Sequence, residues 1–185
     1  MEKSKKSGIF RYHVIKLIVS TVLAILVFIF RETLVINIRY YIASLMFLYF
    51  AEELLFEILF SKKKIFKKDK FFMATVDLIF SLTLFIAPIE YEIVCIIWAC
   101  WSISREMVEI KEIFTELKSL PAKIISGVES ITVIVFSIML ILEPGEHHAL
   151  IHTYLLMVEL ITNAFVLLLD ELLVKEEEIE SKIEE

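Results

Sequence analysis

Charged residues stand inside long apolar runs of this sequence, and their types are suited to chemistry. They are Glu52, Glu53, Asp77, Arg105, Glu129 and Glu159. A carboxylate can take up or pass on a proton or a cation, whereas a guanidinium can hold carboxylates through paired hydrogen bonds. A charge surrounded by apolar side chains is costly unless it meets a partner or water. We therefore expect these six residues to face one another or a wet cavity.

The sequence leaves more than one interpretation of these charges open. In the first, Arg105 pairs with Glu52, Glu129 or Glu159 and ties several helices into one bundle. In the second, the five carboxylates exceed what one cation can neutralise, so that they line an inward-facing path for protons or cations. A third alternative is that Glu52, Glu53 and Glu57 lie near the end of their helix and are not deeply buried. In a protein that crosses a membrane, they would then lie at its inner interface.

Other reactive residue types form weaker patterns. His148 and His152 lie four residues apart in the segment EPGEHHALIH, which places them on one helix face at metal-ligand spacing. Neither Cys nor an HExxH motif accompanies them. This favours a solvated turn whose histidines take up protons at about pH 6. Phosphate-binding and nucleophile motifs are missing, and the chain has only 3 Gly. The sequence therefore predicts a protein that is not an enzyme and has no cofactor.

The composition indicates the kind of protein that holds these charged residues. Hydrophobic residues make up 58% of the 185 residues, whereas a water-soluble domain has about 45–50%. The charged residues fall in blocks between long apolar runs, and the net charge of −6 argues against a nucleic-acid partner. These features predict a protein that crosses a membrane several times and has the lipid bilayer as its partner.

The lengths of the apolar runs give the number of crossings. A helix needs about 20 mostly apolar residues to cross roughly 30 Å of hydrocarbon. The matching segments lie at about 15–30, 37–60, 71–87, 90–108, 122–142 and 148–172. Residues 1–14 form a cytoplasmic N-terminal segment, residues 15–172 the transmembrane domain, and residues 173–185 an acidic cytoplasmic tail. The fourth helix is expected to continue into the cytoplasm as far as Pro121.

The distribution of Lys and Arg predicts the orientation. With six crossings, all of the cations except Arg31 and Arg39 fall on one side of the membrane. Because the cytoplasmic side carries the excess of cations, both termini are predicted to be cytoplasmic in a multi-pass protein of the cell membrane. The basic cluster from Lys62 to Lys70 is predicted to contact anionic lipid headgroups. The protein could associate into a homo-oligomer, although no motif in the sequence indicates one.

The six segments also form an internal repeat of about 53 residues. Its units are three helical hairpins at about 16–64, 71–118 and 123–172. Pro88 and Pro144 mark equivalent outer turns, and Asp77 and Glu129 each lie six residues into their unit. Further charges recur in the return helices at intervals of 53 and 54 residues: Glu52, Arg105 and Glu159. The predicted fold class is therefore an all-α integral membrane protein with six transmembrane helices arranged as three repeated helical hairpins.

This hairpin pattern resembles the HdeD-like acid-resistance membrane proteins over roughly residues 16–172. The third unit, SGVESITVIVFSIMLILEPGEHHALIHTYLLMVELI, carries the resemblance best. The units of that family are rich in glycine, whereas this chain has only Gly8, Gly127 and Gly145. The resemblance implies a non-enzymatic membrane protein linked to stress or acid response. The alternative function is a small proton or cation channel or transporter that uses the carboxylates of the inner half.

Overall fold

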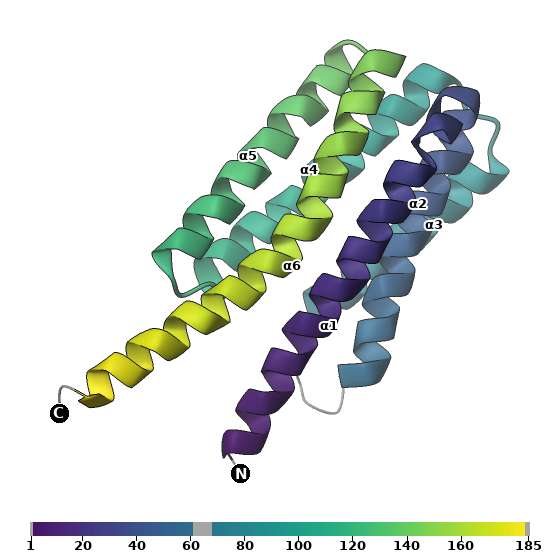
Figure 1. Cartoon of the computed structure of the whole chain (residues 1–185). Helices are drawn as coiled ribbons and strands as arrows, with labels where there is room; N and C mark the ends of the chain where they lie inside the picture. The colour runs from purple at the N-terminus through teal and green to yellow at the C-terminus, as the bar shows by residue number, and fades with distance from the viewer. Residues whose placement is uncertain (1, 61–67, 184–185) are drawn as a thin grey trace.

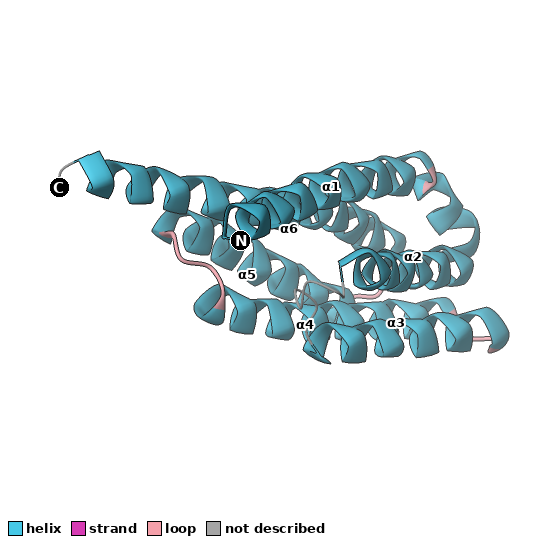
Figure 2. Ribbon diagram, turned by 90° about the horizontal axis from the view of Figure 1, so that it is seen from below, coloured by secondary structure: helices cyan, strands magenta, loops and turns pink. Residues whose placement is uncertain are grey.

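The computed structural model describes the backbone of residues 2–60 and 68–183 and the side chains of residues 10–32, 37–55 and 72–176. This part of the chain consists of six α-helices without a strand (Figures 1 and 2). They are α1 (Glu2–Ile29), α2 (Arg31–Phe60), α3 (Lys68–Ile86), α4 (Tyr91–Thr115), α5 (Leu120–Leu142) and α6 (Glu146–Ile183). The prediction of an all-α chain with six helices is confirmed. Most of the basic cluster from Lys62 to Lys70, and all of its side chains, lie outside the described residues.

The end of α4 differs from the prediction. The helix stops at Thr115, and Pro121 lies in the first turn of α5 rather than at the end of α4. Proline suits a first turn because its fixed φ is helical and its missing N–H would have no partner there. The connection before it is held by Asp170 of α6, whose Oδ1 accepts hydrogen bonds from the backbone N–H groups of Lys118 (3.0 Å) and Ser119 (2.6 Å).

The helices run beside one another, and both chain termini and the α4–α5 connection lie at the same end (Figure 1). The connections α1–α2, α3–α4 and α5–α6 lie at the other end. The most extensive packing joins α2 to α3, α1 to α6 and α4 to α5, followed by α5 to α6. The backbones of α3 and α4, the two helices of the second predicted hairpin, approach each other at very few points. Each helix makes its main contact with a helix of a neighbouring hairpin, although α5 and α6 of the third hairpin also pack together extensively.

The buried apolar core lies where the even-numbered helices meet. Most members of its main cluster come from α2, α4 and α6, and they include Ile42, Met46, Tyr49, Val94, Trp98, Ala99, Leu156 and Leu160. The odd-numbered helices contribute few side chains, among them Ala24, Leu84 and Leu140. The inner helices thus carry four of the six predicted charges, whereas Asp77 and Glu129 are on the outer helices α3 and α5.

Polar side chains cap the helices at the end opposite the termini. Arg31 donates to the carbonyl of Phe28 near the end of α1 (2.9 Å), and Arg39 donates to the carbonyl of Ala87 just after α3 (2.5 Å). A cation is favourable there because the last carbonyls of a helix are unsatisfied and carry partial negative charge. These contacts give Arg31 and Arg39 a structural role at the end of the bundle where the sequence places no other cation. Asn37, at φ −156°, interrupts α2 and separates its first turn from the main helix.

The surface of the bundle is apolar and its interior is unusually polar. On α5 the exposed side chains include Ile124, Val128, Ile131, Val135, Ile138 and Leu142. The buried positions of the same helix are Ala122, Ser126, Ser130, Val133, Ser137 and Leu140. Phe10–Ile29 and Leu120–Leu142 are the stretches long and apolar enough to cross a membrane in the described part of the chain, and Phe72–Ile86 is a shorter apolar helix. All three belong to odd-numbered helices.

Candidate functional site

The predicted charges all lie inside the bundle or at the wall of an internal cavity, but they do not form a single cluster. Asp77, Glu159 and Glu52 are buried, and Glu53, Arg105 and Glu129 are mostly covered. They divide into three groups, each of which joins different helices. The first surrounds Arg105, the second joins Glu52 to α1, and the third brings together carboxylates from α4, α5 and α6.

Arg105 of α4 lies between acids of α2 and α3. Its Nη1 lies 2.8 Å from Oδ2 of Asp77, and its Nη2 lies 3.5 Å from Oε1 of Glu53. The guanidinium also lies over the ring of Tyr49, at 4.3 Å from the ring centre. Trp101 completes the group by donating from Nε1 to the other oxygen of Asp77 at 2.7 Å. The prediction that Arg105 pairs with Glu52, Glu129 or Glu159 is therefore wrong, because Asp77 and Glu53 hold its two terminal nitrogens.

Glu52 belongs to a separate contact between α1 and α2. Its Oε1 accepts a hydrogen bond from the hydroxyl of Ser20 at 3.0 Å. Glu52 and Glu53 are neighbours in sequence and therefore point about 100° apart around the helix axis. This difference sends Glu52 toward α1 and Glu53 toward Arg105.

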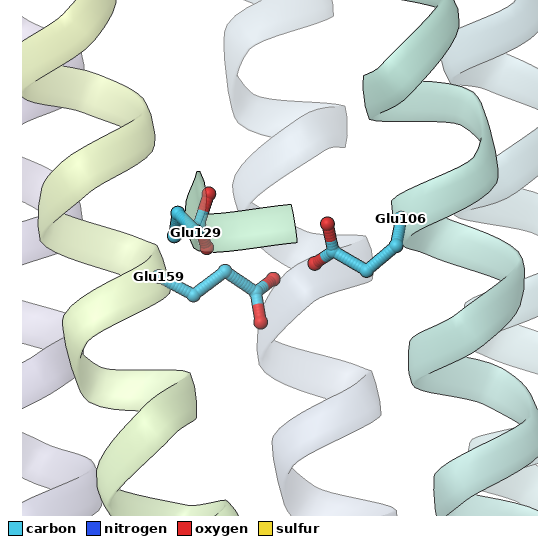
Figure 3. A group of neighbouring side chains, drawn as sticks. All are labelled: Glu106, Glu129 and Glu159. Carbon is cyan, nitrogen blue, oxygen red and sulfur yellow. The ribbon is translucent and has the colours of Figure 1, made fainter. Parts of the chain in front are cut away.

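The third group consists of Glu106, Glu129 and Glu159, which we call the carboxylate triad. Its members come from α4, α5 and α6, and their side chains point toward one another (Figure 3). One oxygen of each lies within 4.8 Å of an oxygen of the other two. Neither oxygen of Glu106 or Glu129 has a hydrogen-bond partner in the described part of the chain. Tyr49 donates to Glu159 at a long 3.4 Å, so the triad concentrates negative charge without an ion pair among the described residues.

Glu106 was not among the residues selected from the sequence, although it is fully buried. A signal for it exists, because Glu53, Glu106 and Glu159 follow one another at intervals of 53 residues. The predicted repeat instead aligns Glu52 and Arg105 with Glu159, one residue earlier in two of the units. Glu109 was also missed. It lies one turn beyond Glu106 on α4 and accepts a hydrogen bond from Asn163 of α6 at 2.9 Å.

Two small polar cavities connect this region to the end of the bundle that holds the termini. Their volumes are about 90 Å³ and about 50 Å³. Lys16, Glu53, Arg105, Glu109 and Asn163 line both of them. The triad does not line either cavity, but the Glu109–Asn163 pair lies one helical turn from Glu106 and from Glu159.

The two histidines that were considered as metal ligands do not converge. His152 is buried, its Nε2 lies 2.9 Å from the hydroxyl of Ser102, and its ring packs edge-on against Trp98. His148 is partly exposed, and its Nδ1 contacts the carbonyl of Glu143 at 3.0 Å. The two rings therefore contact different partners, His152 in the core and His148 at the α5–α6 turn.

The chain was compared with protein-family models, with curated proteins and with solved structures. None of the three comparisons found a match. The resemblance to the HdeD-like proteins therefore stays a prediction from the hairpin pattern. Function is therefore inferred from the geometry of the carboxylate triad, the Arg105 group and the two cavities.

Proposed function

We propose that all six helices cross a cell membrane and that both termini are cytoplasmic. The distribution of side chains supports this proposal, because the outside of the bundle is apolar while serines, carboxylates and a histidine are buried. A water-soluble bundle has the opposite arrangement, with an apolar interior and a polar surface. A continuous apolar surface of this extent requires a partner, and a lipid bilayer provides one for every helix face.

The packing also supports a threefold repeat. Each even-numbered helix packs against the odd-numbered helix that follows it: α2 against α3, α4 against α5 and, across the chain ends, α6 against α1. The same relation thus occurs three times around the bundle. The even-numbered helices occupy the inside in each unit, and each of them carries a glutamate at the 53-residue interval, Glu53, Glu106 and Glu159. We infer that the chain consists of three degenerate copies of one hairpin.

Within this membrane domain, the function that the geometry supports best is the binding and passage of protons or cations. The carboxylate triad carries this proposal. Three carboxylates that meet in a poorly hydrated interior repel one another, so at neutral pH they hold protons or a cation between them. The two cavities beside Glu109 and Asn163 provide a polar approach from the cytoplasmic end.

A second candidate is a non-enzymatic structural role in stress or acid response. The Arg105 group favours it, because one guanidinium joins α2, α3 and α4 through Glu53, Asp77 and the ring of Tyr49. A network of this kind holds helices together and needs no transported ion. In this alternative, the triad only adjusts the stability of the bundle as it gains or loses protons.

Flux through reconstituted vesicles distinguishes the two candidates. We expect vesicles that contain the full chain to dissipate a proton or cation gradient, and Glu106→Gln to abolish this flux. Glu92→Gln is the matched control, because Glu92 lies exposed at the outer end of the same helix and loses the same charge. If the wild-type chain gives no flux under any gradient of protons or of mono- or divalent cations, transport is wrong and the structural role is favoured.

A further inference from the structure

The carboxylate triad has more negative charge than its surroundings can neutralise. Glu106, Glu129 and Glu159 approach one another from three helices, and the first and last of them are almost completely buried. The nearest guanidinium, that of Arg105, is already held by Asp77 and Glu53. Glu109, one turn along α4 from Glu106, is another acid. Three facing carboxylates without an ion pair of their own are an environment that attracts positive charge.

A neutral oxygen beside the triad also lacks a partner. Ser130 of α5 is fully buried, and its hydroxyl makes no hydrogen bond in the described part of the chain. It faces the carboxylate of Glu106, although the two groups do not reach hydrogen-bond geometry. A buried hydroxyl normally has a partner, because leaving it unsatisfied costs free energy. An ion between Ser130 and the three glutamates would satisfy this hydroxyl and both free carboxylates.

The donor set and the spacing indicate which class of ion fits. All four donors are oxygens, which hard cations prefer, and neither Cys nor His takes part. The three carboxylate oxygens lie within 4.8 Å of one another, so an ion at their centre would lie roughly 2.8 Å or less from each. Calcium–oxygen bonds are about 2.3–2.6 Å long and tolerate irregular geometry, whereas Mg²⁺ requires about 2.0–2.1 Å and a near-ideal octahedron. Only a small closure of flexible Glu side chains is needed for calcium.

We propose that Glu106, Glu129, Glu159 and Ser130 form a binding site for a hard divalent cation of the calcium class. The site lies at the junction of α4, α5 and α6, and an ion reaches it from the cytoplasmic end past Glu109 and Asn163. This inference rests on the proposed function, for which it names the bound ion. The two proposals can be tested separately, because the site can bind an ion at equilibrium without releasing it on the other side of the membrane.

Calorimetric titration of the full chain in mild detergent with CaCl₂ tests the site. We expect saturable binding of one ion per chain, at least tenfold weaker in Glu106→Gln and in Glu159→Gln, which keep the side-chain shape but remove a charge. Ser130→Ala should weaken binding several-fold. Ser137→Ala is its matched control, because Ser137 is a second fully buried serine of α5 without a hydrogen-bond partner, and it should bind as the wild type does. Because the ion binds only the folded chain, Ca²⁺ should also raise the melting temperature.

Failure of the site and failure of the transport proposal give different results. If the folded wild-type chain binds neither Ca²⁺ nor Mg²⁺ nor Mn²⁺, or if a triple Glu→Gln variant binds Ca²⁺ as tightly, the site is wrong. Proton flux without any binding of Ca²⁺ also refutes the site, since the triad would then hold protons only, but it leaves transport intact. Binding that depends on the triad, without any flux, supports the site and refutes transport. Circular dichroism of each variant checks that a loss of binding is not a loss of the fold.

Discussion

Arg105 illustrates how one residue organises several helices. Its two terminal nitrogens contact Asp77 and Glu53, and its flat face lies on Tyr49. An arginine can make these contacts together because its guanidinium is planar, always charged and weakly hydrated. Asp77 is fixed further by the indole N–H of Trp101. Within the described residues, removing the cation would leave this buried acid with a single hydrogen bond and no opposite charge.

We therefore expect Arg105→Leu to lower the free energy of unfolding in detergent by about 3–5 kcal/mol, the usual cost of removing one partner of a buried ion pair. Arg105→Lys should lose less, because it keeps the charge but not the paired geometry. The double variant Arg105→Leu with Asp77→Leu should recover part of the loss, since the unpaired acid is gone. Arg105→Leu with Glu52→Leu should not, because Glu52 contacts Ser20 instead. Equal recovery in both double variants would refute the pairing.

The helix α5 has two faces with opposite character, and this division sets its place in the bundle. Four of its six buried positions are alanine or serine, which let α4 and α6 approach closely. Its exposed positions are large aliphatic residues, which would be unfavourable in water but suit the hydrocarbon of a membrane. The mean polarity of the helix conveys neither fact, because it averages over both faces.

A charge placed on the exposed face tests the surroundings of α5. Ile131, at the middle of the helix, and Leu120, at its first residue, are 62% and 68% exposed. In a bilayer, we expect Ile131→Lys to reduce insertion and to cost about 2.5–3.5 kcal/mol, whereas Leu120→Lys should be tolerated because its amine reaches the interface. Membrane insertion assays measure both. If the two variants insert and fold equally well, α5 does not cross the hydrocarbon.

At the scale of the whole molecule, the ends of the bundle differ in their chemistry. The chain termini, the α4–α5 connection and the polar cavities gather at one end, while the opposite end holds three short connections with few cations (Figure 1). If all six helices cross the membrane as proposed, the cation distribution predicts that the first end is cytoplasmic. In that orientation, an ion that enters the cavities comes from the cytoplasmic side.

Labelling of single cysteines tests this orientation. Starting from a chain in which Cys95 and Cys100 are replaced by alanine, a cysteine at Glu146 should react with an impermeant maleimide in intact cells. A cysteine at Lys118 should react only after permeabilisation. In the chain that retains its own thiols, Cys100 is exposed but should stay unlabelled in the bilayer, because lipid keeps the reagent out. Labelling of both engineered positions from the same side would overturn the six-crossing topology. A third informative position, Lys64, lies outside the described residues.

The sequence alone was sufficient to predict the six helices. Each apolar run is longer than a buried strand and long enough for a helix that crosses a membrane, and polar connections separate one run from the next. It also indicated which residues would lie inside, since a carboxylate or guanidinium in an apolar segment must turn away from the apolar surroundings. Asp77, Glu159 and Arg105 are indeed covered. The predicted end of α4 was wrong, because Pro121 can either follow a helix or begin one and the sequence does not distinguish the two.

The pairing of these charges was decided only by the tertiary structure. Neighbouring residues of a helix point about 100° apart, so the choice between Arg105 and Glu106 as the residue that faces Glu159 depends on how α4 is rotated. That rotation follows from the packing of α4 against α5, with Trp98 and Ala99 buried in the core. The repeat interval alone allowed either alignment. Packing turned Arg105 toward Asp77 and Glu106 toward Glu129 and Glu159, and thereby separated a structural ion pair from the candidate cation site.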